Sequence, residues 1–510
     1  MKCGYHRWQD GWLAIGLSVF TFLSRIPFRS QILYHWDSVN FAYAMREFSV
    51  AKGQPQPPGY IVYVWLCRLV DLVFDDPQQT MVGISIVASV LAVVALFYLG
   101  RAMFDRWVGL MAALFWATSP LFWFYGEIAL PHSLDALMVI VSVWWLYEVM
   151  QGDYRYLYPM VALLAVAGGV RQQTIVFLAP VLLFALRRVG LKRFLLAGAL
   201  GAGICLAWFV PLMALSGGFS SYMHVMGEFG RSFQSTTSVF MGAGWWGLRR
   251  NLIKLTLYSS YGWSVAIIPA AAYAIVRLWR RELPRKWETG VFFFLWIVPA
   301  LTFYVIVHMG QQGLVFVFLP ALLLFSAVAL KRLLAAQSNL WIAGTVAIAA
   351  LNVGIFCLLP EYPLGPGPLR LLTRSTLVNS DHYYQDRFRA IEENFGPMST
   401  AILVENWHHV EYYLPAYKLL PFDIVPKWEW GAGQARVQEG EERRLTGQDL
   451  GLLPEVDGLV RIVVFDEDLA PFNDTPELMQ VVELDHGGSM GVFALSTDQS
   501  LYLGQTFGVD

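Results

Sequence analysis

The sequence predicts an α-helical polytopic membrane protein that ends in a small α/β domain. Hydrophobic residues make up 56% of the 510 residues and charged residues only 15%, whereas a soluble domain carries about 25% charged residues. Apolar stretches that approach the ~20 residues needed to cross a bilayer recur along the first 360 residues. Beyond residue 360 the apolar runs shorten and charge increases, which indicates a soluble region after the last span.

About eleven apolar segments are the expected transmembrane helices. The first is expected to remain in the protein as a span, because no small-residue cleavage site follows it. Several segments are shorter than ~20 residues, so their ends are approximate. The expected spans are 11–28, 81–100, 107–124, 130–149, 157–170, 172–187, 194–215, 252–279, 290–308, 312–330 and 339–359.

The apolar segment 59–74 is expected to be a surface helix, because of how the basic residues are distributed. Lys and Arg in short loops favour the cytoplasmic side of a membrane. If 59–74 does not cross, the basic N-terminus and all later basic loops fall on one side. Arg68 and Asp71 also lie in this segment, where charge at mid-membrane is costly. We therefore expect a first outer loop at 29–80, a cytoplasmic N-terminus and an extracytoplasmic region after residue 359.

The chain is expected to divide into a transmembrane domain, 1–359, and a soluble extracytoplasmic α/β domain, 360–510. The two are joined by a Pro/Gly linker, PEYPLGPGP, at 360–368. In the second domain the composition predicts strands at 401–404, 459–465 and 480–484, a helix at 384–394 and a solvated loop at 440–449.

The first candidate site follows the first span. Asp37 lies there with His35, Trp36 and Asn40, and the turn QPQPPGY follows at 54–60. A carboxylate at a membrane boundary can act as a general base toward an acceptor hydroxyl. The alternative is a helix cap, since an Asp followed three residues later by Asn is common at helix starts.

The second candidate site is YGEIALPHSLD at 125–135. His132 and Asp135 share a helix face if Pro131 is the first helical residue, and Glu127 precedes them in the expected outer loop. A metal site built from Glu127, His132 and Asp135 has too few diagnostic ligands and no HExxH-type spacing. A capped helix start explains Asp135 but leaves Glu127 unexplained.

Two further polar stretches lie at span ends. In GGVRQQT (168–174), Arg171 stands beside Gln172, and its guanidinium offers a fork of donors suited to phosphate. Snorkelling toward the interface is the competing explanation. In HMGQQ (308–312), His308 and Gln311 form a second polar group, for which an interfacial histidine is the alternative.

Several function classes are not indicated. The 4 Cys form neither a CxxC nor a Cys/His metal spacing, and no Lys/Arg block suggests nucleic-acid binding. A P-loop and a GxGxxG after a strand are absent, so cytosolic nucleotide use is not expected. We predict no cofactor; a divalent metal ion is compatible with the acidic residues but is not indicated.

The motifs together resemble the GT-C glycosyltransferases, specifically the bacterial branch similar to protein O-mannosyltransferases and the lipid A aminoarabinose transferase. The resemblance covers roughly residues 10–360. It rests on WDSVNFAYA, QPPGYIVYVW, RAMFDRW, SPLFWFYGEIALPHSLDA and HMGQQGLVFVFLP, in that order. The chain departs from this pattern in having QPP where related proteins have HPP or KPP, and in a single acid where the mannosyltransferases have Asp-Glu.

The resemblance implies inverting transfer of a sugar from a polyprenyl-phosphate donor to an acceptor hydroxyl on a protein, lipid or glycan. The reaction would take place on the outer face of the inner or plasma membrane. Asp37 would be the general base, Asp135 matches the second acid, and Glu127 lies close enough in sequence to share that role. The donor phosphate would contact Arg171 and His308. Other candidates for substrate binding are His35, Asn40, His132, Gln172 and Gln311. A transporter or flippase of lipid-linked sugars is the alternative function.

Overall fold

The computed structural model describes residues 2–280, 287–335, 338–363, 370–404, 407–421, 424–426, 435–437, 443–446, 460–466, 479–495 and 500–503. The chain forms two compact units. Unit 1 comprises Met1–Ser30, Asn40–Pro360 and Leu372–Ser375, and unit 2 comprises Gln31–Val39, Glu361–Leu371 and Thr376–Asp510. The segment Gln31–Val39, which contains Asp37, is therefore grouped with the C-terminal residues rather than with the chain on either side of it.

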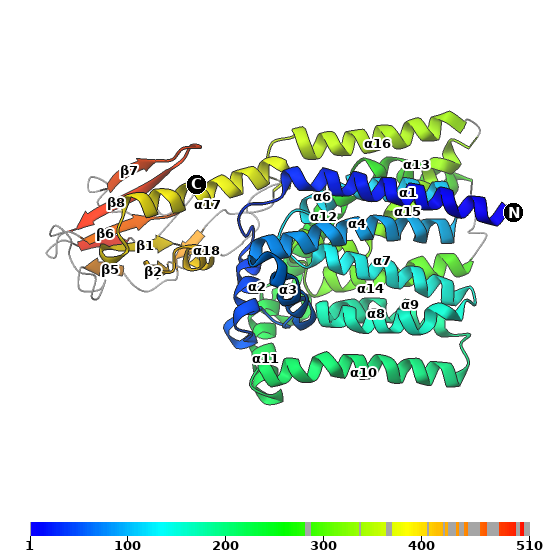
Figure 1. Cartoon of the computed structure of the whole chain (residues 1–510), viewed down its shortest axis with the longest axis horizontal. Coiled ribbons are helices and arrows are strands. Elements are labelled where there is room, and N and C mark those ends of the chain that lie inside the picture. Colours follow the sequence, from blue (N-terminus) through cyan, green and yellow to red (C-terminus); the bar gives the residue numbers. More distant parts are fainter. Residues whose placement is uncertain are drawn as a thin grey trace. The chain divides into compact units, whose positions relative to one another are not determined.

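Unit 1 is built mainly of helices that run alongside one another (Figure 1). Its longer helices are α1 (Lys2–Arg25), α4 (Pro77–Met103), α5 (Arg106–Thr118), α7 (His132–Met150), α8 (Leu157–Val170), α9 (Gln172–Leu186), α10 (Leu191–Leu215), α11 (Phe219–Ser235), α12 (Gly244–Trp263), α13 (Ile267–Trp279), α14 (Trp287–Ile306), α15 (Leu319–Leu333) and α16 (Ser338–Leu358). Its shorter elements include α3 (Ile61–Phe74), α6 (Pro120–Tyr125) and the 3-10 helix η6 (Gln312–Val317). Helix α2 (Trp36–Arg46) begins in unit 2 and continues into unit 1 from Asn40 on.

A helix forms over each of the eleven expected spans, with α5 and α6 covering one and α12 and α13 another. In the described residues, seven segments are long and apolar enough to cross a membrane: Trp8–Phe28, Pro77–Met103, His132–Met150, Leu191–Leu215, Val239–Trp279, Trp287–Ile306 and Asn339–Leu358. Tyr154–Val170 and Gln172–Leu186 are apolar but shorter.

Ion pairs join the helix ends that carry the basic loops. Asp10, near the start of α1, pairs with Arg101 of α4 at 3.0 Å and with Arg106 of α5 at 2.6 Å. At the end of α15, Lys331 pairs with Asp105, the residue that caps α5, at 2.7 Å. Arg101, Arg106 and Lys331 therefore lie at the same end of the helices.

Helix α3 is stabilised by contacts with the loop elements beside it. Two nitrogens of Arg68 donate hydrogen bonds to the carbonyl oxygens of Ala44 and Met45, which end α2. Asp71 accepts a hydrogen bond from Thr80 in the first turn of α4. Both charged residues of this apolar segment therefore have hydrogen-bond partners at the ends of neighbouring helices. The last carbonyl oxygens of a helix have no partner within that helix and are free to accept such bonds.

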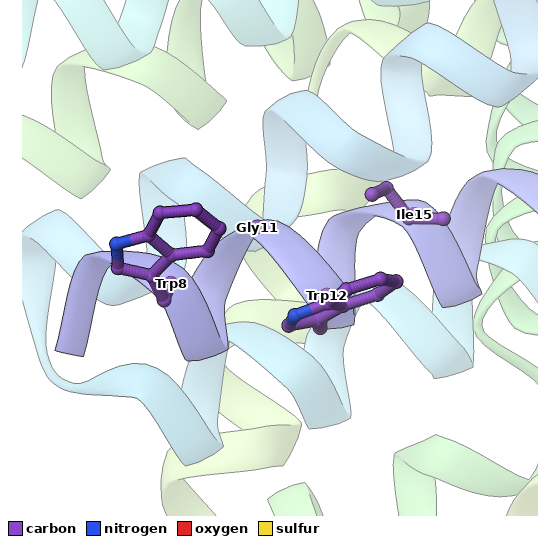
Figure 2. A pocket seen from close by; sticks show the side chains of 4 residues that line it. All are labelled: Trp8, Gly11, Trp12 and Ile15. Carbon is purple, nitrogen blue, oxygen red and sulfur yellow. The ribbon is translucent and has the colours of Figure 1, made fainter. Parts of the chain in front are cut away.

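One face of α1 is apolar and exposed. Trp8 and Trp12 are 75% and 68% exposed, and together with Gly11 and Ile15 they line an apolar pocket along the helix (Figure 2). Exposed tryptophans on a span are typical of contact with lipid near a membrane interface. The pocket contains none of the predicted site residues.

Unit 2 contains a five-stranded mixed sheet in the order β2-β1-β6-β8-β7. Its strands are β1 (Thr400–Val404), β2 (Lys418–Pro421), β6 (Val460–Val464), β7 (Met479–Glu483) and β8 (Ser489–Leu495); β1 pairs in parallel with β2 and β6, and β8 is antiparallel to β6 and β7. Two-stranded ladders join β3 (Ile424–Pro426) to β4 (Ala435–Val437) and β5 (Arg443–Thr446) to β9 (Ser500–Leu503). Helices α17 (Arg374–Asn394) and α18 (Trp407–Tyr413) complete the unit.

The three expected strands correspond to β1, β6 and β7, and the expected helix 384–394 is the second half of α17. Most of the predicted linker lies outside the described residues, as does the predicted loop 440–449 apart from β5. The expected boundary at residue 360 stays a prediction.

Candidate functional site

Asp135 and Arg171 form a buried ion pair at the ends of two helices in unit 1. Asp135 lies in the first turn of α7, and Arg171 lies between α8 and α9. Arg171 Nη1 donates to Asp135 Oδ2 at 3.2 Å, and Thr174 Oγ1 donates to Asp135 Oδ1 at 2.6 Å. Both oxygens of the carboxylate are therefore engaged, and the carboxylate fixes the orientation of the guanidinium.

His308 faces three cationic side chains. It follows α14, and burial, together with the charges of Arg250, Lys254 and Arg171, lowers the pKa of its imidazole to about 3. Arg250 and Lys254 are four residues apart on α12 and share one face of that helix. With His308 neutral, the guanidinium groups of Arg171 and Arg250 against the single carboxylate of Asp135 leave this group of side chains with a positive charge that suits an anion, and Lys254 adds to it when protonated.

The loop that carries His308 is held by the buried Asn251 of α12. The Asn251 amide nitrogen donates to the carbonyl oxygens of Thr237 and Val305, and its oxygen accepts the backbone N–H of Met309 at 3.2 Å. Arg250 Nη1 donates to the Met309 carbonyl oxygen at 3.3 Å. Two successive residues of α12 therefore fix the backbone immediately after His308.

The proline turn is held by Gln172 and Tyr222. The hydroxyl of Tyr222, in α11, donates to the Pro58 carbonyl oxygen at 3.1 Å, and the Gln172 amide donates to Tyr222 at 3.2 Å and to the same carbonyl oxygen at 3.4 Å. Gly59, which follows, has a φ of 112°, a conformation that glycine adopts readily. The turn thus lies next to the helix whose N-cap is Arg171.

His132 packs between Tyr125 and η6. The centroids of the Tyr125 and His132 rings are 4.8 Å apart. A Cβ atom on Gly313, in η6, would lie 2.5 Å from His132 Cδ2, so only glycine fits at position 313. Gln311 is the N-cap of η6. These contacts connect the start of α7 with the stretch that follows His308.

Glu127 has a different set of partners. It is fully buried, accepts a hydrogen bond from Trp123 Nε1 at 2.7 Å, and lies near the buried Arg25, which stacks on the Trp123 ring. Burial raises the pKa of Glu127 well above its ordinary value, although Arg25 and Trp123 oppose the shift. Glu127 is thus engaged by α1 and α6 rather than by Arg171.

Asp37 and His35 belong to unit 2, whereas Asn40, one helical turn further along α2, belongs to unit 1. His35 Nδ1 accepts the backbone N–H of Asp37 at 3.1 Å and lies 3.6 Å from Asp37 Oδ2. Because burial lowers the pKa of His35 to about 4, its ring is neutral at pH 7. Asn40 is buried in α2.

Among the residues that the structure describes, no group of three or more His, Cys, Asp or Glu side chains is arranged to hold a metal ion. The expectation that the protein needs no cofactor stays a prediction.

Comparison with known proteins adds a family match over part of the chain. Residues 55–214 match the family Dolichyl-phosphate-mannose-protein mannosyltransferase. ArnT from Cupriavidus metallidurans bound to undecaprenyl phosphate has a TM-score of 0.54 with this chain, at 14% identity, with 95% of this chain and 98% of ArnT covered. The predicted resemblance to GT-C glycosyltransferases is confirmed. So is the predicted fold class, a helical polytopic membrane protein with a small C-terminal sheet.

The apo structure of the same ArnT gives the same values. The oligosaccharyltransferase AglB from Archaeoglobus fulgidus, in complex with an inhibitory peptide and a dolichol-phosphate, has a TM-score of 0.42 at 13% identity, with 81% of this chain and 65% of AglB covered. That likeness is too low to support an inference. No curated protein matches the sequence.

Within unit 1, the structure brings Asp135, Arg171 and His308 together, and it adds two basic residues that sequence reasoning missed. Arg250 and Lys254 lie in RRNLIKL, at residues 249–255. A signal was present: Lys254 is a cation inside the expected span 252–279, where it needs an anion or an aqueous cavity. The role of Asn251 could not be predicted from the sequence, because its partners Val305 and Met309 are more than fifty residues away in the chain.

Proposed function

We propose that this protein transfers a sugar from a polyprenyl-phosphate donor to an acceptor hydroxyl at the membrane boundary, with inversion at the anomeric carbon. Asp37 takes the proton of the acceptor hydroxyl, whose oxygen attacks the anomeric carbon as the bond from that carbon to the phosphate oxygen breaks. The polyprenyl phosphate leaves as an anion. The N-terminus would lie in the cytoplasm, and unit 2 on the extracytoplasmic side of the inner or plasma membrane.

The observation that carries this proposal is the group of basic side chains around His308. Arg171 is held by Asp135, Arg250 binds the carbonyl oxygen of Met309 next to His308, and Lys254 lies one turn from Arg250. Preorganised cations aimed at the position where negative charge develops are usually the largest source of transition-state stabilisation. A phosphate leaving group needs little protonation, so these cations would replace a general acid. The membrane-embedded helices around them suit a donor with a lipid tail.

Asp135 would act in this scheme by orienting Arg171. Its two oxygens are taken by Arg171 and Thr174, and a carboxylate engaged in this way is a weak acceptor for a substrate proton. Glu127, which is buried against Trp123, would support the fold of the loop before α7. We therefore assign the base role to Asp37 alone among the three predicted acids.

The comparisons support the donor class. The family that matches residues 55–214 is described by its use of dolichyl-phosphate-mannose, and the ArnT structure of similar fold was solved with undecaprenyl phosphate bound. By analogy, the undecaprenyl or dolichyl phosphate group would bind among Arg171, Arg250 and Lys254.

The test is binding of undecaprenyl phosphate to the purified full-length protein in nanodiscs. Arg250→Gln and Lys254→Gln are each expected to weaken binding about tenfold, since a hydrogen bond to a charged group contributes about 1.5–3 kcal/mol and each 1.4 kcal/mol is about tenfold. Arg188→Gln is the matched control. Arg188 follows α9 and pairs with Glu288 at the start of α14, so it is a paired arginine that is not part of the group around His308. Equal affinities in all four proteins would overturn the phosphate site.

Sugar transfer is measured with a panel of polyprenyl-phosphate sugars as donors. The acceptor is either water or a compound with a hydroxyl group. Release of the sugar from the lipid phosphate supports the enzyme. Movement of the intact lipid-linked sugar across the bilayer without cleavage would instead support a flippase.

A further inference from the structure

The short segment that leads into Asp37 is built into unit 2. We propose that α17 and α18 of unit 2 position Asp37 for catalysis, with Asp381, His409 and Tyr413 as positioning residues. This inference rests on the proposed role of Asp37 as the base. It assigns to the C-terminal part of the chain a task that neither the family match nor the motifs suggest.

The first attachment is made by Asp381 of α17. Its Oδ2 accepts the backbone N–H of Gln31 at 2.9 Å, and its Oδ1 accepts the backbone N–H of Ile32 at 3.1 Å. The carboxylate is buried, with 8% of the residue exposed. Two charge-assisted hydrogen bonds from one buried carboxylate hold consecutive residues of the segment in a fixed conformation.

The second attachment is made by α18. The Tyr413 hydroxyl accepts the backbone N–H of Leu33 at 3.1 Å, and His409 Nε2 lies 2.6 Å from the Leu33 carbonyl oxygen. Since a carbonyl oxygen only accepts, His409 carries its proton on Nε2. The His409 ring is buried and stacks on Tyr384 at 4.3 Å. Both backbone groups of Leu33 are thus bound by one short helix.

Packing fixes the segment as well. The side chain of Ile32 is part of the hydrophobic core of unit 2, in contact with a cluster that includes Phe388, Ile391 and Val410. Leu33 is fully buried. A residue inserted into a close-packed core has few alternative positions, so the backbone at residues 32 and 33 moves with the core of unit 2.

Only three residues separate Leu33 from Asp37, and the last of them, Trp36, packs against α18. The Trp36 ring lies 5.6 Å from the His408 ring, and His35 Nδ1 accepts the Asp37 backbone N–H. Helix α2 begins at Trp36. A general base must be held within hydrogen-bond reach of the proton it removes, and a small displacement of a reacting group lowers the rate steeply.

If Asp381 and Tyr413 only stabilised unit 2, other substitutions that weaken unit 2 would lower kcat equally. Controls within unit 2 are therefore needed. Asp381→Ala is compared with Asp386→Ala, because Asp386 is a buried carboxylate of the same helix that binds His486 and Arg389. Tyr413→Phe is compared with Tyr417→Phe, whose hydroxyl donates to the Phe395 carbonyl oxygen at 2.7 Å.

The experiment measures amide hydrogen exchange at residues 31–33, sugar transfer and undecaprenyl phosphate affinity in the full-length protein. Asp381→Ala and Tyr413→Phe are expected to accelerate exchange at these amides and to lower kcat about tenfold or more, with donor affinity within twofold of wild type. His409→Gln, which keeps a donor at the corresponding position, is expected to retain more activity than His409→Ala. The controls are expected to leave both the exchange at 31–33 and kcat near wild type.

The inference is overturned if the controls lower kcat as much as Asp381→Ala and Tyr413→Phe do. It is also overturned if exchange at 31–33 is unchanged in all variants. Failure of the proposed function looks different, because wild-type protein would then neither bind undecaprenyl phosphate nor cleave any polyprenyl-phosphate sugar.

Discussion

Arg171 and Asp135 form an ion pair in which both side chains are at least nine-tenths buried and Nη1 lies 3.2 Å from Oδ2. Arg171 interrupts the apolar run between α8 and α9. This break lies at the same end of unit 1 as the first turn of α7, which carries Asp135, so the two side chains meet. A buried guanidinium needs a carboxylate or another anion. The pair therefore holds Arg171 in place when no phosphate is bound.

Asp135→Asn is expected to lower the free energy of unfolding by about 3 kcal/mol, because removing one partner of a buried pair leaves an uncompensated charge. In the double variant Asp135→Asn/Arg171→Gln both charges are gone, so the loss should be smaller than the sum of the two single losses. Denaturation of the four proteins in one detergent measures the coupling. Strictly additive losses would contradict a direct interaction.

Asp37→Asn is expected to reduce transfer about 10²–10⁴-fold, the contribution usual for general-base catalysis. The amide has nearly the shape of the carboxylate, and the backbone N–H that His35 accepts is kept, so folding and undecaprenyl phosphate affinity should stay at wild-type values. Single-turnover sugar transfer measures the effect. Turnover equal to wild type would remove Asp37 from the mechanism.

The positions of the helices could be predicted from the sequence because bilayer-length apolar runs and basic loops are local signals. For the same reason Arg171 and His308 stood out as polar residues at the ends of apolar segments. Their proximity could be expected only from the motif resemblance, whereas the partners of Arg171 became visible in the structure. Thr174, for example, looks in the sequence like any small residue of a span.

The grouping of residues 31–39 with the C-terminal unit could not be predicted. Asp381 lies 350 residues from Gln31 in sequence, and Ile32 gives no sign that it packs against Val410 rather than against a neighbouring span. Contacts at such separation follow from the tertiary arrangement, which no local pattern encodes. The predicted site contained Asp37, the proposed base, but not the residues that hold its segment.

Asn251→Ala is expected to weaken undecaprenyl phosphate binding several-fold and to lower the free energy of unfolding by about 1–3 kcal/mol, since it leaves buried backbone groups of the His308 loop unsatisfied. Asn352→Ala is the matched control. Asn352 is also buried in unit 1, but it donates to Thr118 at 3.4 Å on another pair of helices. Binding and unfolding are measured on both variants. A similar loss of stability with equal loss of affinity in the two variants would show that Asn251 acts only on the fold.

The stability of unit 2 is expected to fall as the pH drops from about 6.5 to about 4. Burial lowers the pKa of His409 to about 4, while its bond to Leu33 opposes the shift and the nearby His35 and His408 add to it. Since the ordinary pKa of histidine is 6.5, the unfolded chain binds a proton in this pH range that the folded chain does not, and the free energy of unfolding therefore decreases with falling pH. At about 1.4 kcal/mol per pKa unit, His409 accounts for at most about 3 kcal/mol.

Amide exchange at residues 31–33, corrected for the intrinsic effect of pH, measures this loss between pH 7 and pH 4.5. His409→Gln should show a weaker pH dependence, because the glutamine keeps a donor for the Leu33 carbonyl oxygen but does not titrate. His224→Gln, on the exposed surface of α11 beside Glu228, should behave like wild type. An unchanged pH dependence in His409→Gln would mean that other groups, such as His35 with its own lowered pKa, control the acid sensitivity of the segment.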